Sequence, residues 1–61
     1  MLFALFKHGT DVFGSTKDFN DWLNNENFFF DGKPPAGYLK TITGIRYVDR
    51  RLTAMEYGDN V

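Results

Sequence analysis

The last third of the chain carries apolar residues at intervals of three, four and three positions. This spacing places them on one stripe of a helix, so we predict an amphipathic helix here. The stripe consists of Ile45, Val48, Leu52 and Met55. Thr41 is suited to cap the start of the helix, and Gly58 is suited to end it. The charged residues of this stretch fall on the other faces, and the helix is expected to present them outward.

Two further helices are predicted nearer the N-terminus. Apolar residues recur at helical spacing over Leu2–Phe13, which we expect to form the first helix. Gly9 lies inside it at a cost of about 1 kcal/mol relative to alanine, which close approach of another helix would explain. Gly14 can stop this helix, and Ser15 can then cap a second helix over Thr16–Asn24. The second helix presents three apolar side chains on one face, those of Phe19, Trp22 and Leu23.

Three consecutive phenylalanines, Phe28–Phe30, precede an Asp-Gly turn. This arrangement is typical of half a β-hairpin, but Pro34 and Pro35 cannot donate the ladder hydrogen bonds that a matching strand needs. We therefore interpret Phe28–Phe30 as an apolar loop whose side chains plug the space between helices. Pro35 suits the first turn of a short helix, about Pro35–Leu39. The sequence thus predicts one all-α domain over residues 1–61, a small bundle of three longer helices plus one short helix.

Composition limits the chemistry open to this chain. It has no cysteine and a single histidine, which excludes disulfides, thiolate zinc sites and histidine-rich metal sites. His8 has no ligand-type residue four positions on, and we expect it to be an ordinary surface or helix-end residue. Asp18 and Asp21 are better explained by capping and solubility than by acid–base catalysis, which needs a cleft. We therefore predict a protein that is not an enzyme and uses no cofactor.

Charge and hydropathy exclude further classes of function. The formal net charge of −1 argues against strong nonspecific binding of nucleic acid, which needs a basic face. Acidic residues dominate up to Gly32 and basic residues from Lys33 onward, which is either an ordinary surface dipole or a steering face for an acidic partner. No apolar run approaches the roughly 20 residues of a membrane span, and the N-terminus lacks the features of a signal peptide. We therefore expect a cytoplasmic protein that does not bind membranes.

The order and spacing of several short motifs resemble the toxin-binding domain of the Xre/MbcA/ParS antitoxins. The family shows a Phe-Gly at the end of one helix, a Trp-Leu in the next, a Gly-x-x-Pro loop before a Leu-x-Thr, and a Glu-Tyr-Gly-like motif at its end. The matching segments here are Val12–Gly14, Trp22-Leu23, Phe30–Pro35, Tyr38–Thr41, Gly44–Val48 and Leu52–Gly58. The resemblance covers nearly the whole chain, closely from Val12 to Gly58 and loosely over the first helix.

The resemblance implies an antitoxin module whose usual partner is a RES-type toxin, an enzyme that destroys cellular NAD. It further implies that the C-terminal region of the domain occupies or covers the active-site cleft of the toxin. Antitoxins of this family normally carry an upstream helix-turn-helix domain that binds DNA, and 61 residues leave no room for one. DNA binding is therefore not expected of this domain alone. The chain is either a fragment of a longer antitoxin or a stand-alone inhibitor domain.

The resemblance places the partner-binding residues on the outer face of the last helix and in the tail that follows. These residues are Arg46, Arg50, Arg51, Glu56, Tyr57, Gly58, Asp59, Asn60 and Val61. Arg46 and Arg50 are four residues apart on one strip, and arginine can form forked hydrogen bonds with carboxylates. Gly44, in the first helical turn, is explained either by close helix packing or by close approach of a partner backbone.

Two other functions fit the sequence. Eleven aromatic residues is a high number for so small a domain, and a chain of this length buries only about 60% of its unfolded surface. Surplus phenylalanines could therefore pack against copies of the chain, as in a homo-oligomerisation module, and homodimers are common in the resembled family. The third and weakest hypothesis is a nucleic-acid binder that stacks bases on Phe28–Phe30 and contacts phosphates with its basic second half.

Overall fold

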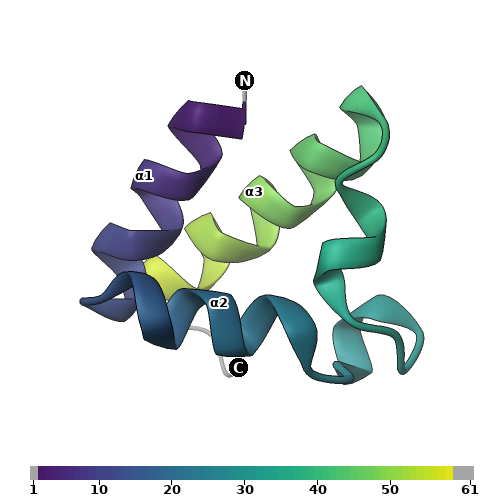
Figure 1. The fold of residues 1–61 in the computed structure, drawn as a ribbon, viewed down its shortest axis with the longest axis horizontal. Coiled ribbons are helices and arrows are strands. Elements are labelled where there is room, and N and C mark those ends of the chain that lie inside the picture. The colour runs from purple at the N-terminus through teal and green to yellow at the C-terminus, as the bar shows by residue number, and fades with distance from the viewer. Residues whose placement is uncertain (1, 59–61) are drawn as a thin grey trace.

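The computed structural model describes residues 2–58, which form three α-helices and two 3-10 helices. Figure 1 shows α1 on one side of the molecule, the two 3-10 helices on the opposite side, α2 along one edge and α3 running diagonally behind them. The elements in chain order are α1 (Leu2–Phe13), α2 (Thr16–Asn24), η1 (Phe28–Phe30), η2 (Pro35–Tyr38) and α3 (Ile42–Glu56). The all-α prediction is confirmed, and the described residues contain no strand beyond an isolated bridge between Asn27 and Lys33.

The helix boundaries follow from local capping. Gly14 ends α1 with a positive φ of 84°, a conformation that glycine adopts without steric cost. The Ser15 hydroxyl then accepts a hydrogen bond from the Asp18 amide at 3.1 Å, which satisfies one of the free amides at the start of α2. The Thr41 hydroxyl caps α3 in the same way, accepting from the Gly44 amide at 3.0 Å. These caps are the ones predicted from the sequence.

Eight hydrophobic side chains form the core, and every α-helix contributes to it. They are Leu5 of α1; Phe19, Trp22 and Leu23 of α2; Phe30 of η1; and Ile45, Val48 and Leu52 of α3. The predicted stripe of α3 is thus buried, except that Met55 at its end is only partly buried. Fixing the stripe against α1 and α2 determines which face of α3 remains outside.

Two glycines permit close packing of the elements. A Cβ on Gly9 would overlap the ring of Phe19, so α2 does approach α1 at this position, as the sequence predicted. A Cβ on Gly44 would overlap the backbone carbonyl of Tyr38. Close packing of η2 against the start of α3 therefore explains Gly44, and no partner backbone is needed to account for it.

The segment Phe28–Phe30 differs from the predicted plug. It forms one turn of 3-10 helix, whose three residues per turn point successive side chains in three different directions. Only Phe30 reaches the core, where it is 0% exposed, whereas Phe28 is 89% exposed and Phe29 37% exposed. The short helix after it is also 3-10 and ends at Tyr38, one residue before the predicted end.

Candidate partner-binding surface

The outer face of α3 presents the arginines that the sequence singled out, and they border two different depressions. Arg46 and Arg50 are exposed, while Arg51 is half-buried. Arg46 lies beside α1, in a shallow hollow of about 220 Å³ that also contains Asp49. Arg50 and Arg51 lie beside η1, in a separate groove of about 230 Å³. Arg46 and Arg50 are about one helical turn apart on α3, as their spacing predicts, and their side chains border different depressions.

The groove beside η1 combines aromatic and cationic side chains. Its lining residues are Phe29, Tyr47, Arg50, Arg51 and Ala54. The guanidinium carbon of Arg51 lies 3.6 Å from the centroid of the Phe29 ring, which is a close cation–π contact. The Tyr47 hydroxyl donates a hydrogen bond to the Phe29 carbonyl at 2.6 Å. Two side chains of α3 thus hold η1 in place, and we call this depression the η1–α3 groove.

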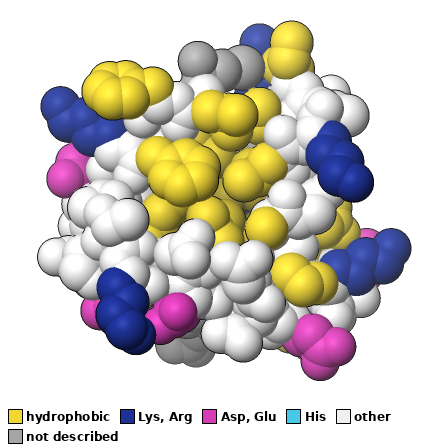
Figure 2. Space-filling model, viewed as in Figure 1, with side chains coloured by type: hydrophobic (Ala, Val, Ile, Leu, Met, Phe, Trp, Pro, Cys, Tyr) yellow, Lys and Arg dark blue, Asp and Glu magenta, His cyan; other side chains and the backbone are white. Residues whose placement is uncertain are grey.

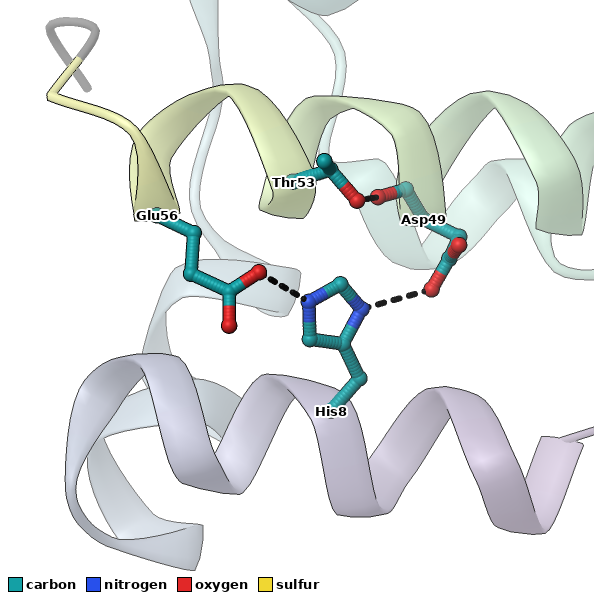
Figure 3. Close-up of polar contacts among 4 residues, drawn as sticks. All are labelled: His8, Asp49, Thr53 and Glu56. Atoms are coloured by element: carbon teal, nitrogen blue, oxygen red, sulfur yellow. Dashed lines mark hydrogen bonds and ion pairs between the residues drawn. The ribbon is translucent and has the colours of Figure 1, made fainter.

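His8 occupies a very different position from the ordinary surface site that we expected. Its ring projects from α1 between two carboxylates of α3, as Figure 3 shows. Nδ1 lies 2.7 Å from Asp49 Oδ1, and Nε2 lies 2.9 Å from Glu56 Oε1. The expectation was wrong because the two carboxylates are 41 and 48 positions away in sequence, so no local pattern around His8 signals them.

The two contacts of His8 favour its charged form. A carboxylate only accepts hydrogen bonds, so both ring nitrogens must carry a proton for both bonds to form. The hydrogen bond that His8 donates to Asp49 raises the pKa of His8 above 6.5, partial burial opposes this, and the hydrogen bond donated to Glu56 raises the pKa further. The cluster therefore clamps α1 to α3 electrostatically. Thr53 is nearby, but its hydroxyl donates to the Asp49 backbone carbonyl at 3.1 Å and makes no contact with His8 in Figure 3.

Glu56 was predicted to contact a partner, and the structure engages it with His8. Its side chain is about half exposed, so one side of the carboxylate faces solvent. This arrangement orients Glu56 toward α1 and away from the arginines of the η1–α3 groove, which lies on the η1 side of α3. Among the described residues no group of three or more His, Cys, Asp or Glu side chains could hold a metal ion.

A scan against protein-family models matched residues 8–58 to the antitoxin Xre/MbcA/ParS C-terminal toxin-binding domain. The chain belongs to this family. Searches of curated proteins and of solved structures found no match. The matched region contains the complete α2, η1, η2 and α3, and therefore the η1–α3 groove and the His8 clamp of this toxin-binding domain.

The C-terminal end of the toxin-binding domain is exposed as far as the structure describes it. Tyr57 is 85% exposed, and Gly58 has a positive φ of 97°, as expected of a residue that ends a helix. The remaining residues of the predicted tail, Asp59, Asn60 and Val61, lie outside the described residues. No helix in the described part of the domain is long and apolar enough to span a membrane.

Tyr47 was not predicted as a site residue, and Phe29 was considered only as part of the run Phe28–Phe30 in the nucleic-acid hypothesis. Tyr47 is aromatic, lies outside the apolar stripe of α3 and precedes Arg51 by one helical turn. This combination in the sequence could have indicated that Tyr47 lies on the outer face beside an arginine. Nothing in the sequence around Phe29 indicated that its side chain would be partly exposed beside α3, because that exposure depends on the 3-10 geometry of η1. On the face viewed in Figure 1, Figure 2 shows hydrophobic side chains gathered at the centre, with charged side chains around the rim.

Proposed function

We propose that this antitoxin domain inhibits a RES-type toxin that degrades NAD. In this proposal the domain performs no chemistry and covers the active site of the toxin with the C-terminal half of α3 and the residues that follow. The observation that carries the proposal is the cationic outer face of α3, which leads to an exposed C-terminal end at Tyr57. Membership of the family indicates that the partner is a toxin. We propose in addition that the toxin is of the RES type and that the domain covers its active site.

The buried stripe of α3 supports such a mechanism. Val48 and Leu52 are 0% exposed, so α3 is fixed in one orientation before the toxin arrives. A preformed helix avoids much of the ordering cost of association, which improves affinity. Arg46 and Arg50 then pair with acidic groups of the toxin, and residues 57–61 block access of NAD to the pocket. Because free NAD is an intracellular metabolite, we place this encounter in the cytoplasm.

The test is an NAD-consumption assay with the toxin encoded beside this protein. The full chain is expected to bind the toxin and suppress loss of NAD. A variant lacking residues 57–61 is expected to bind more weakly and to release NAD consumption, whereas Lys40→Glu, an exposed change before α3, should inhibit like the wild type. Failure of the full chain to bind any RES-type protein would reject the proposal.

A homo-oligomerisation module remains the second candidate, and the outer face of α1 favours it. Phe3 is 84% exposed and Phe6 is 38% exposed, and both line a hollow of about 280 Å³ on that face. Light scattering on the isolated chain tests this function, because a monomer at high concentration excludes it. A homodimer that also binds the toxin would unite both candidates.

The nucleic-acid hypothesis loses part of its basis. It required Phe28–Phe30 to offer three rings for base stacking, but Phe30 is fully buried in the core. Phe28 and Phe29 are left as exposed rings. We therefore do not assign DNA binding to this domain, and binding to single-stranded DNA at low salt would show that this assignment is wrong.

A further inference from the structure

We propose that the His8 clamp opens on one side when its ring loses a proton, so that Glu56 is released while Asp49 stays bound. The release loosens the last turn of α3, residues 53–56, at the end of the helix that covers the toxin in the proposed function. The C-terminal end of α3 is therefore held more firmly at low pH than at high pH. The consequence for toxin binding rests on the proposed function, whereas the opening itself is a property of the free domain.

The geometry of the clamp requires a ring that is protonated on both nitrogens. Figure 3 shows the imidazole between two carboxylates, with Nδ1 2.7 Å from Asp49 Oδ1 and Nε2 2.9 Å from Glu56 Oε1. A carboxylate only accepts hydrogen bonds, and a neutral imidazole has a single N–H to donate. When the ring becomes neutral, one nitrogen therefore presents a lone pair to a carboxylate, and that hydrogen bond is lost.

The hydrogen bond to Glu56 is the weaker of the two. It is longer and exposed, whereas the hydrogen bond to Asp49 is shorter and partly buried. Glu56 is also the last residue of α3, and its side chain has one more rotatable bond than that of Asp49, which gives its carboxylate more freedom to turn toward solvent. The proton should therefore leave Nε2 for water, and the neutral ring should keep its Nδ1–H bonded to Asp49.

The last turn of α3 depends on the charge of His8. This turn contains no basic residue, and the Glu56 carboxylate is repelled by the negative C-terminal end of the helix dipole. Protonated His8 offsets that repulsion. The turn itself is closed by long hydrogen bonds, since the Tyr57 amide donates to the carbonyls of Thr53 and Ala54 at 3.3 and 3.2 Å. Loss of the His8 contact therefore leaves the Glu56 charge unopposed by His8, beside a weakly closed turn.

Among the described residues, Asp49 and Glu56 of α3 are the charged groups that act on His8. α2 also packs against α1 but adds no such group, and neither do Lys7 and Asp11, the neighbours of His8 on α1. The hydrogen bond donated to Asp49 is the largest cause of the raised pKa of His8, partial burial opposes it, and the bond donated to Glu56 adds to it. The clamp is therefore closed below about pH 6.5 and opens as pH rises through the raised pKa.

Nuclear magnetic resonance of the isotope-labelled full chain tests the proposal. The ring-nitrogen shifts of His8 report which nitrogen is protonated, and the neutral ring should carry its proton on Nδ1. Amide-exchange protection factors, which correct for the intrinsic pH dependence of exchange, should fall about threefold at Tyr57 and Gly58 as His8 titrates. A neutral ring protonated on Nε2, or protection that does not change, would overturn the proposal.

Asp49→Asn is the sharpest variant, because an amide can also donate a hydrogen bond. Its N–H can donate to Nδ1 of the neutral ring, which then keeps its proton on Nε2 for Glu56. Protection at Tyr57 and Gly58 should therefore stay high throughout the titration, and a fall as large as that in the wild type would contradict the proposal. His8→Gln keeps every other titratable group and should show no pH-dependent fall. The ring-nitrogen shifts of the wild type decide the question even if a variant does not fold.

Binding to the toxin encoded beside this protein separates the two proposals. Isothermal titration calorimetry below and above the titration of His8 compares the wild type with Asp49→Asn, so that titrations of the toxin itself cancel. The wild type should lose about threefold more affinity than the variant as pH rises. Equal losses would overturn the effect on binding and leave the proposed function standing. A wild type that does not bind would reject the proposed function together with the effect on binding, and the exchange measurements on the free chain then decide the opening of the clamp.

Discussion

The Nδ1 atom of His8 lies 2.7 Å from Oδ1 of Asp49, although 41 positions separate the two residues in sequence. His8 lies on α1 and Asp49 on α3, so this contact joins the first and last helices of the domain. With Glu56 on the other ring nitrogen, the imidazole bridges two carboxylates that are nearly two turns apart on α3. The free energy that holds α1 against α3 therefore depends in part on the protonation of His8.

The first prediction concerns pH. Because the pKa of His8 is raised from 6.5 on folding, protonated His8 stabilises the folded state. This contribution is fully present below about pH 6.5 and is lost as pH rises through the higher folded pKa. The wild type should therefore lose stability as pH rises from about 6.5 through the raised pKa of folded His8. Urea unfolding at a series of pH values measures this change.

His8→Gln provides the control for this prediction, because a neutral amide cannot titrate. Its free energy of unfolding should be lower than that of the wild type below pH 6.5, and nearly independent of pH over the same range. A wild type whose stability rises with pH over this range would contradict the assigned role of His8.

The second prediction compares two phenylalanines that are two positions apart. Phe30→Ala removes a fully buried ring that contacts Trp22 at a centroid distance of 5.8 Å, and should cost about 3–5 kcal/mol. A domain of this size has little more stability than that, so the variant should be unfolded at room temperature. Phe28→Ala removes a ring that is 89% exposed and should change stability by less than about 0.5 kcal/mol. Circular dichroism melting curves distinguish the two outcomes.

The third prediction concerns Gly9. Alanine normally stabilises a helix by about 1 kcal/mol relative to glycine. At Gly9, however, the new Cβ would overlap the Phe19 ring, and that ring is enclosed by Phe6, Phe13 and Trp22. Gly9→Ala should therefore lower stability by about 1–3 kcal/mol.

Gly37→Ala is the matched control, because no heavy atom lies within 4 Å of a Cβ built there. This variant should be as stable as the wild type within about 0.5 kcal/mol. If Gly9→Ala were the more stable of the two in urea unfolding, α2 would not pack on α1 in the way described.

The fourth prediction concerns the tether between α3 and η1. Tyr47→Phe removes the hydroxyl that donates to the Phe29 carbonyl, and should cost about 0.5–1 kcal/mol because the bond is exposed. It should also speed amide exchange across Phe28–Phe30, as η1 is held less firmly. Tyr57→Phe alters a side chain that is 85% exposed and should leave both quantities unchanged. Equal exchange rates in the two variants would show that the hydroxyl does not hold η1.

Much of the fold was predictable because its signals are local. The predicted bounds of the first two helices, Leu2–Phe13 and Thr16–Asn24, are confirmed, and the cap of α3 at Thr41 is confirmed as well. Periodicity and capping act between residues three or four apart, so a single sequence contains them. The prediction that Phe28–Phe30 fill the space between helices is correct for Phe30 and wrong for Phe28, because an apolar run alone does not indicate which side chains face inward.

The candidate site was less accessible to sequence reasoning. Arg50 and Arg51 were selected as outward residues of α3, and the structure places both in one groove. Arg46 was grouped with Arg50 by its spacing, and the structure adds that Arg46 borders a different depression, beside α1. Which depression each arginine borders depends on the elements that pack on either side of α3. The spacing of residues along one helix does not indicate which other elements pack against it. The roles of the predicted tail residues Asp59, Asn60 and Val61 stay predictions.

Residue order alone was enough to predict the helices, their caps, the apolar stripe of α3 and the family resemblance, which the match to the family model confirmed. All of these depend on the identity and order of residues close together along the chain. The folded domain was needed to identify the partners of His8, the exposure of each phenylalanine in η1 and the depression that each arginine borders. Those features arise where distant segments meet, because burial, charge pairing and groove shape depend on both surfaces at once.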